Sequence, residues 1–183
     1  MEHYAEVSFG ETQRRDYGKR LSEIFQAAHR ALNKAGEGLV GLSFPDWAHG
    51  ATSAGVSLGQ RFYLVSSDAD VLKGVVLELQ EEQTPLILSE IRPVPADAGR
   101  AIFCRSRQHQ RYFHHQRHGD EQGKADAAEK LGDLRAIPTV RIASKSTRQS
   151  FRIAIDCRPP ESEVEGSSFN SYGLSSNLSV PVF

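Results

Sequence analysis

The feature that most constrains the fold is the order of expected strands and helices along residues 1–94, which the spacing of apolar residues indicates. Residues 3–9, 40–44, 61–67 and 85–94 have the alternating or continuous apolar patterns of strands. Residues 17–34 place apolar side chains at helical spacing, and Asp68 is suited to cap a second helix that runs to about residue 79. This strand–helix–strand–strand–helix–strand order is that of ferredoxin-like folds, which RNA-recognition modules share. The aromatic signature of those modules is absent, so the order predicts a fold but no function.

The second half of the chain has a different pattern and indicates a second lobe. Residues 93–100, PVPADAGR, have the Pro and Gly content of a linker. After it we expect an extended segment at 101–107, helices at about 108–118 and 120–135, and strands at 139–144, 149–156 and 169–175. The sequence thus predicts an α+β protein with a ferredoxin-like lobe at residues 1–94. A second α+β lobe with a basic helix is predicted at residues 95–183.

Positive charge is concentrated in two windows of that second lobe. The chain has 22 Lys and Arg against 23 Asp and Glu, a formal net charge of −1. Residues 98–119 nevertheless contain five arginines and four histidines with no acidic residue, and residues 134–155 contain five cations with none. Solvated protein surfaces usually mix both signs. Two windows of one sign therefore favour a polyanionic ligand, with nucleic acid ahead of a small anion.

Other classes of protein are disfavoured by what the sequence lacks. No apolar run approaches the roughly 20 residues needed to cross a bilayer. Glu2 and Glu6 stand where a signal peptide has basic and apolar residues. Two cysteines, Cys104 and Cys157, are too few for a disulfide framework or a four-thiolate zinc site. We therefore expect a soluble protein of a reducing cytoplasm that does not enter a membrane.

Four stretches of the chain carry a resemblance to a known family. They are MEHY at the start, VGLSFPDW at 40–47, SKSTRQSFRI at 144–153 and YGLSSNLSVPVF at 172–183. In this order and spacing they resemble the CRISPR-associated endoribonuclease that processes precursor RNA in type I-F systems. The resemblance implies a prokaryotic cytoplasmic enzyme that cuts the CRISPR repeat RNA at the base of its stem-loop. It also implies that the product hairpin stays bound and that the protein joins other subunits of a surveillance complex.

The resemblance implies a catalytic set as well. His29, in the predicted first helix, stands where the family carries its catalytic histidine and would act as the base that activates the 2′-hydroxyl. Ser144 would hold the ribose or the 2′-hydroxyl itself, and Tyr172 would orient the imidazole. RNA carries its own nucleophile, so scission by the 2′-hydroxyl needs no metal, no cofactor and no covalent enzyme intermediate. An imidazole that titrates near neutrality suits the role of the base.

The same resemblance assigns residues that hold RNA. Ser146 and Thr147 would donate hydrogen bonds to the RNA backbone near the cleavage point, and Phe151 would stack under the terminal base pair of the hairpin. Where the family has an arginine and, two positions on, a glutamine, this chain has Arg105 and Arg107, which predicts guanine at both contacted positions. The stretch 108–118 departs from the family, with fewer arginines and more histidines. There we expect phosphate contacts from Arg111, His114, Arg117 and His118.

Other interpretations stay open on the residues alone. A non-catalytic module could bind an RNA hairpin with the same two lobes, and His29 would then be structural. Ser144 and His29 could belong to a serine hydrolase, although the sequence has no G-x-S-x-G elbow. His114 and His118 have the i,i+4 spacing of a metal pair, but the nearby acidic residues are limited to Asp120 and Glu121. No metal site is therefore predicted.

Overall fold

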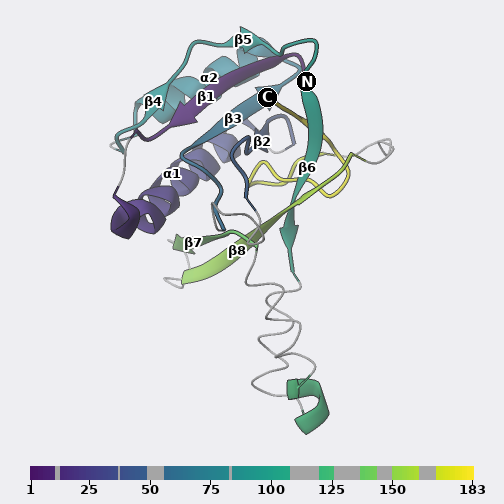
Figure 1. Ribbon diagram of the computed structural model, residues 1–183. Coiled ribbons are helices and arrows are strands. Elements are labelled where there is room, and N and C mark those ends of the chain that lie inside the picture. Colours follow the sequence, from purple (N-terminus) through teal and green to yellow (C-terminus); the bar gives the residue numbers. More distant parts are fainter. Residues whose placement is uncertain are drawn as a thin grey trace.

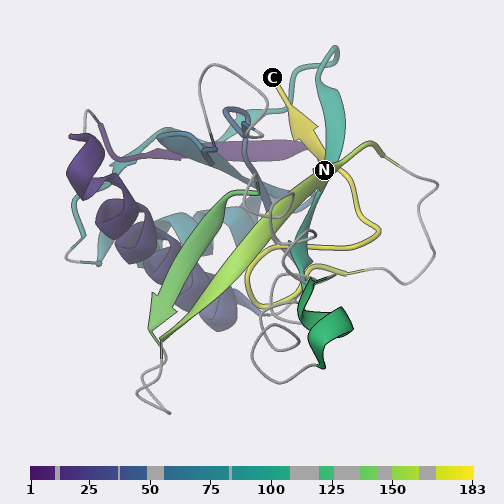
Figure 2. The same cartoon turned by 60° about the horizontal axis from the view of Figure 1, so that its bottom comes forward.

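Residues 1–94 fold around a sheet whose strand order is that of the ferredoxin-like pattern (Figure 1). The computed structural model describes residues 1–10, 13–36, 38–48, 56–82, 84–107, 120–125, 137–143, 150–160 and 168–183. Strands β1 (His3–Ser8), β2 (Gly41–Ser43), β3 (Arg61–Ser66) and β4 (Ile87–Leu88) form the order β2-β3-β1-β4 with antiparallel neighbours. Helices α1 (Arg14–Ala35) and α2 (Ala69–Gln80) make the two crossovers and lie on the same side of this sheet (Figure 2).

Both helices predicted for residues 1–94 are confirmed. They form because their apolar residues are spaced so that they face the core. The α1 residues expected to face inward, Leu21, Ile24, Phe25, Ala28 and Leu32, are all buried. Asp68 precedes α2, and its carboxylate accepts hydrogen bonds from the backbone N–H groups of residues 70 and 71 at 2.8 and 3.3 Å. These two bonds satisfy backbone donors that the first turn of a helix leaves without intrahelical partners.

The predicted fourth strand at 85–94 is in fact two short strands. β4 pairs with one end of β1, and β5 (Arg92–Pro93) pairs with its other end. Between them Ser89 replaces regular pairing, because its hydroxyl accepts from the N–H of Glu6 at 2.8 Å while its own N–H donates to the Glu6 carbonyl at 3.0 Å. The register shifts by one residue across this point, which is the effect of a β-bulge.

The second half of the chain forms a separate antiparallel sheet in the order β7-β8-β6-β9. Its strands are β6 (Gly99–Ser106), β7 (Thr139–Ala143), β8 (Ser150–Arg158) and β9 (Val180–Val182). β9 was not predicted, and the strand predicted at 169–175 is wrong, because that segment forms a turn. Residues 121–125 are helical, within the helix predicted at 120–135. The predicted basic helix at 108–118 lies outside the described residues.

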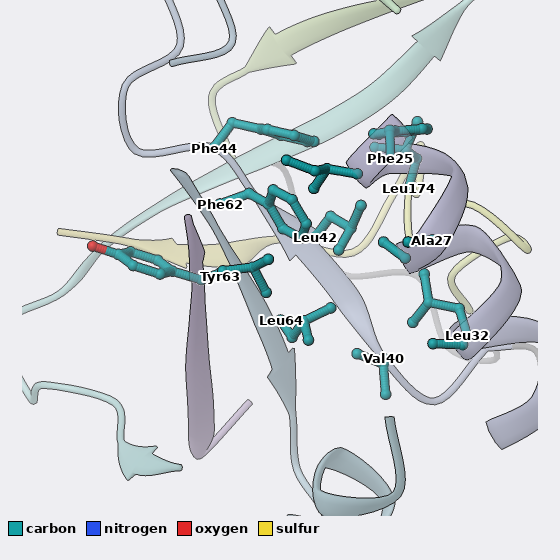
Figure 3. Close-up of a cluster of buried hydrophobic side chains, with 14 of the residues drawn as sticks. Phe25, Ala27, Leu32, Val40, Leu42, Phe44, Phe62, Tyr63, Leu64 and Leu174 are labelled. Carbon is teal, nitrogen blue, oxygen red and sulfur yellow. The ribbon is translucent and has the colours of Figure 1, made fainter. Parts of the chain in front are cut away.

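One hydrophobic core joins the two sheets. Figure 3 shows the part of this core around α1, β2 and β3. Side chains of the first lobe, among them Phe25, Leu42, Phe44 and Phe62, share the cluster with others from beyond residue 95, including Phe103, Val140, Ile153, Phe169 and Leu174. The division into lobes at residue 94 stays a prediction, but the buried surface is continuous across it. In the described part of the chain, no helix is long and apolar enough to cross a membrane.

Candidate active site

Helix α1 presents His29 at the edge of its buried face. The preceding residue, Ala28, is fully buried, whereas His29 itself is half-buried. One turn earlier, Phe25 is buried and anchors this part of the helix in the core. The imidazole therefore has one side against protein and another toward solvent, a position from which it can meet a ligand.

The segment that lies against His29 is the turn at residues 169–175. The side-chain carbonyl of Asn170 accepts from the N–H of Tyr172 at 2.9 Å and from that of Leu174 at 3.3 Å. Gly173 has a φ of +69°, a conformation that L side chains rarely adopt, and it donates its N–H to the carbonyl of Asn170 at 2.8 Å. Phe169 and Leu174 are buried on either side of this turn. The turn is therefore fixed by its own hydrogen bonds and by two apolar anchors.

Two of the stretches that carried the family resemblance meet at this turn. The carbonyl of Gly173 accepts from the N–H of Leu42 at 2.8 Å. A Cβ on Gly41 would lie 2.5 Å from the ring of Phe169, so only glycine lets that ring pack against β2. Nearby, the Ser43 hydroxyl donates to the carbonyl of Pro181 at 2.6 Å. GLS at 41–43 and YGL at 172–174, which are far apart in the sequence, thus form one interface that holds the turn beside α1.

His29 and Tyr172 are brought into direct contact by this interface. Their rings stack with centroids 4.1 Å apart and planes 15° apart. The imidazole Nδ1 lies 2.6 Å from the backbone carbonyl oxygen of Ser171. A carbonyl oxygen can only accept, so Nδ1–H is the donor, and the lone pair of the neutral ring is on Nε2. The ring is therefore held in one plane and one tautomer.

Two further neighbours of His29 were missed by the sequence analysis. The side-chain nitrogen of Asn33, one turn further along α1, lies 3.3 Å from each ring nitrogen of His29. Its i,i+4 spacing was a readable signal. The Ser171 carbonyl is a backbone group, and no residue type could have indicated it. Beside the site, the guanidinium of Arg30 donates hydrogen bonds to the carboxylate of Glu82, which connect α1 to the end of α2 and raise the pKa of Arg30.

A second pair of predicted site residues also meets. The guanidinium of Arg105, on β6, lies over the ring of Phe151, on β8, at 5.9 Å from the ring centroid. Both side chains are half-buried, and Arg107 is exposed just after the end of β6. The sheet explains the contact, because Arg105 pairs with Ile155, which is on the same face of β8 as Phe151.

The other predicted site residues lie outside the described part of the chain. They are Ser144, Ser146, Thr147, Arg111, His114, Arg117 and His118. Ser144 directly follows β7, and the hairpin of β7 and β8 closes with the pair Ala143 and Ser150. Within the described ranges, no group of three or more His, Cys, Asp or Glu side chains is arranged to hold a metal ion.

Residues 4–183 match the family described as CRISPR-associated protein (Cas_Csy4). Because the match spans almost the whole chain, the chain belongs to this family, and the resemblance indicated by its motifs is confirmed. A similar curated relative is the CRISPR-associated endonuclease Cas6/Csy4 of Pseudomonas aeruginosa (strain UCBPP-PA14), which is 25% identical over 194 residues and is covered completely, as is this chain.

A solved structure described as an RAMP protein binding different RNA substrates also aligns with the chain. The alignment covers 100% of both chains, with 10% sequence identity and a TM-score of 0.41. The strand order described above, and not this similarity, carries the assignment of the fold.

Proposed function

We propose that this chain is an endoribonuclease that processes precursor CRISPR RNA by cutting each repeat at the base of its stem-loop. Membership of the Cas_Csy4 family and the endonuclease name of its curated relative support this function. The observation that carries it is the oriented imidazole of His29, held between the Ser171 carbonyl and the Tyr172 ring. The protein would act in a prokaryotic cytoplasm and keep its product hairpin within a surveillance complex.

His29 is the proposed base of the reaction. With Nδ1–H donated to Ser171, the lone pair that takes the proton of the ribose 2′-hydroxyl is on Nε2, and the 2′-hydroxyl would replace the side-chain nitrogen of Asn33, which lies 3.3 Å from Nε2. The 2′-oxygen then attacks the adjacent phosphorus, the bond from phosphorus to the 5′-oxygen breaks, and the departing 5′-oxygen takes a proton from water. The imidazolium afterwards returns its proton to the solvent. The upstream product ends in a 2′,3′-cyclic phosphate, and the downstream product begins with a 5′-hydroxyl.

Tyr172 is proposed to act as a positioning residue, because its ring restrains the plane of the imidazole by stacking. Ser144 is proposed, on the resemblance, to hold the 2′-hydroxyl for in-line attack. Phe151 offers a half-buried ring for the terminal base pair, and Arg105 and Arg107 are proposed to contact guanines beside it. Ser146, Thr147, Arg111, His114, Arg117 and His118 stay predictions as backbone contacts.

Cleavage of a cognate repeat hairpin in EDTA tests the function. We expect His29→Ala to abolish cutting while hairpin affinity stays within a few-fold of the unmutated protein. His3→Ala, a histidine on β1, serves as the matched control and should cut normally. A 2′-deoxy nucleotide before the scissile phosphate should block cleavage and leave binding intact. If His29→Ala loses binding in step with cleavage, the histidine is structural, and a non-catalytic hairpin-binding module becomes the better interpretation.

A further inference from the structure

A groove runs between α1 and the hairpin formed by β7 and β8. Figure 2 shows that these elements lie side by side. Its volume is about 620 Å³. From α1 it is lined by residues near the start and middle of the helix, and from the hairpin by alternate residues of the two strands. The lining residues are Gly18, Lys19, Ser22, Glu23, Gln26, Thr139, Arg141, Ala143, Ser150 and Arg152.

The hairpin side of the groove carries two positive charges. Arg141 and Arg152 are directly opposite each other on adjacent strands, and both are exposed. Like charges at such a pair destabilise a sheet. Arg141 donates to the neutral hydroxyl of Ser150 at 3.1 Å, and among the described residues neither arginine forms an ion pair. An anion in the groove would relieve this repulsion.

The helix side of the groove does not cancel that charge. Lys19 lies 3.9 Å from Glu23, so the one acidic residue of the lining already has a cation beside it. Among the described lining residues there are three cations against one carboxylate. Both arginines also belong to the acid-free window at 134–155, and neither of them has a role in the site at His29. The ligand that fits is an extended polyanion.

The groove leads toward His29. On an α-helix, residues seven or eleven positions apart lie on the same flank, and each residue advances 1.5 Å along the axis. His29 follows Ser22 by seven positions and Gly18 by eleven, so it shares the flank that lines the groove. Gln26 is about 4.5 Å from His29 along the axis, and Gly18 is about 16 Å away. A strand that leaves the imidazole along α1 therefore enters the groove.

We propose that this groove binds the single-stranded RNA downstream of the cleavage point, with Arg141 and Arg152 contacting its phosphates. The inference rests on the proposed function, which puts the scissile phosphate at His29. In that reaction the hairpin belongs to the upstream product and occupies the surface around Phe151 and Arg105. The downstream strand must leave in another direction, and the groove supplies a positively charged path for it.

Binding of two cleavage-resistant RNAs tests the proposal. Both contain the cognate repeat hairpin with a 2′-deoxy nucleotide before the scissile phosphate. One ends a single nucleotide after that phosphate, and the other continues with a 3′ tail of about eight uridines. We expect the unmutated protein to bind the tailed RNA about tenfold more tightly. Arg141→Ala/Arg152→Ala should lose this gain, bind the short RNA as before, and reduce the salt slope for the tailed RNA by about 1.4.

A matched control removes two exposed cations outside the groove. Lys73→Ala/Arg92→Ala should keep the tenfold gain, since these residues lie on α2 and β5. Each single variant, Arg141→Ala or Arg152→Ala, should give about half the change in salt slope. The proposal is overturned if the tail gives no gain, if the double arginine variant keeps it, or if a 5′ tail gives the same gain.

The experiment also separates this proposal from the function on which it rests. If the unmodified hairpin is cleaved normally but binding does not depend on the tail, the groove proposal is refuted and the proposed nuclease function stands. If the tail strengthens binding through both arginines but the unmodified hairpin is not cleaved, the groove is an RNA-binding site and the proposed catalysis is refuted.

Discussion

Substitution of Gly173 by alanine probes the turn that holds His29. The added Cβ would lie 2.7 Å from the Cγ of Leu42 and 3.2 Å from both the Cδ1 of Leu32 and the backbone nitrogen of Leu42. Leu42 is buried in the centre of the core, and its backbone nitrogen is hydrogen-bonded to Gly173 itself. Neither atom can move away without disturbing β2.

Two costs add in this variant. A φ of +69° disfavours a residue with a Cβ by about 1–2 kcal/mol. Overpacking a well-filled core by one methyl group costs about 1–3 kcal/mol. The free energy of unfolding should therefore fall by about 2–5 kcal/mol, a large part of the roughly 5–15 kcal/mol of a typical domain. The melting temperature should drop by at least about 5 °C.

Urea unfolding of the purified variant measures this loss. Gly74→Ala is the matched control, because a Cβ at Gly74 meets nothing within 4 Å in the exposed face of α2. That variant should gain up to about 1 kcal/mol from higher helix propensity. At a temperature where Gly173→Ala is still folded, cleavage should be slower than in the unmutated protein, since the Ser171 carbonyl would shift from the imidazole. A loss of stability below about 0.5 kcal/mol would refute the close-packing argument.

Three further predictions test other parts of the structure. Ser43→Ala should lower the free energy of unfolding by about 1–3 kcal/mol in urea, because the carbonyl of Pro181 loses its buried donor; a neutral result would mean that water replaces the hydroxyl. Arg30→Gln should cost about 1 kcal/mol or less, and less still at high salt, since its ion pair with Glu82 is partly exposed. Burial raises the pKa of Cys157 to about 11, so at pH 8 iodoacetamide should alkylate it about a hundredfold more slowly than a thiol of pKa 9. Because the thiolate reacts, the rate should keep rising up to about pH 11; a plateau near pH 9 would contradict the shift.

Elements that depend on local apolar spacing could be predicted from the sequence. The prediction failed for segments whose conformation depends on tertiary contacts. The apolar spacing of α1 and the cap at Asp68 were sufficient, since both act within one or two turns. The turn at 169–175 was predicted as a strand because its residues were interpreted as an alternating apolar and polar pattern. Its conformation is set by the Asn170 side chain and by Leu42, which is far away in the sequence and leaves room for a glycine but not for a larger residue at position 173.

The candidate site was predictable in part. The contact between His29 and Tyr172 followed from the family resemblance, and nothing in the spacing of the two residues indicated it. The contact of Arg105 with Phe151 depends on the pairing of β6 with β8, which was not predicted. The Ser171 carbonyl that fixes the tautomer could not be predicted at all, because every residue has the same backbone group.

The hydrogen bond between His29 and Ser171 joins residues that are 142 positions apart. During translation at about 5–20 residues per second, the histidine leaves the ribosome roughly 7 to 30 seconds before its partner. Throughout that interval α1 can form, but its imidazole lacks both the carbonyl and the tyrosine ring that orient it. In the proposed function His29 is the base, so the nascent chain would have no oriented base while the messenger that encodes it is still being read nearby.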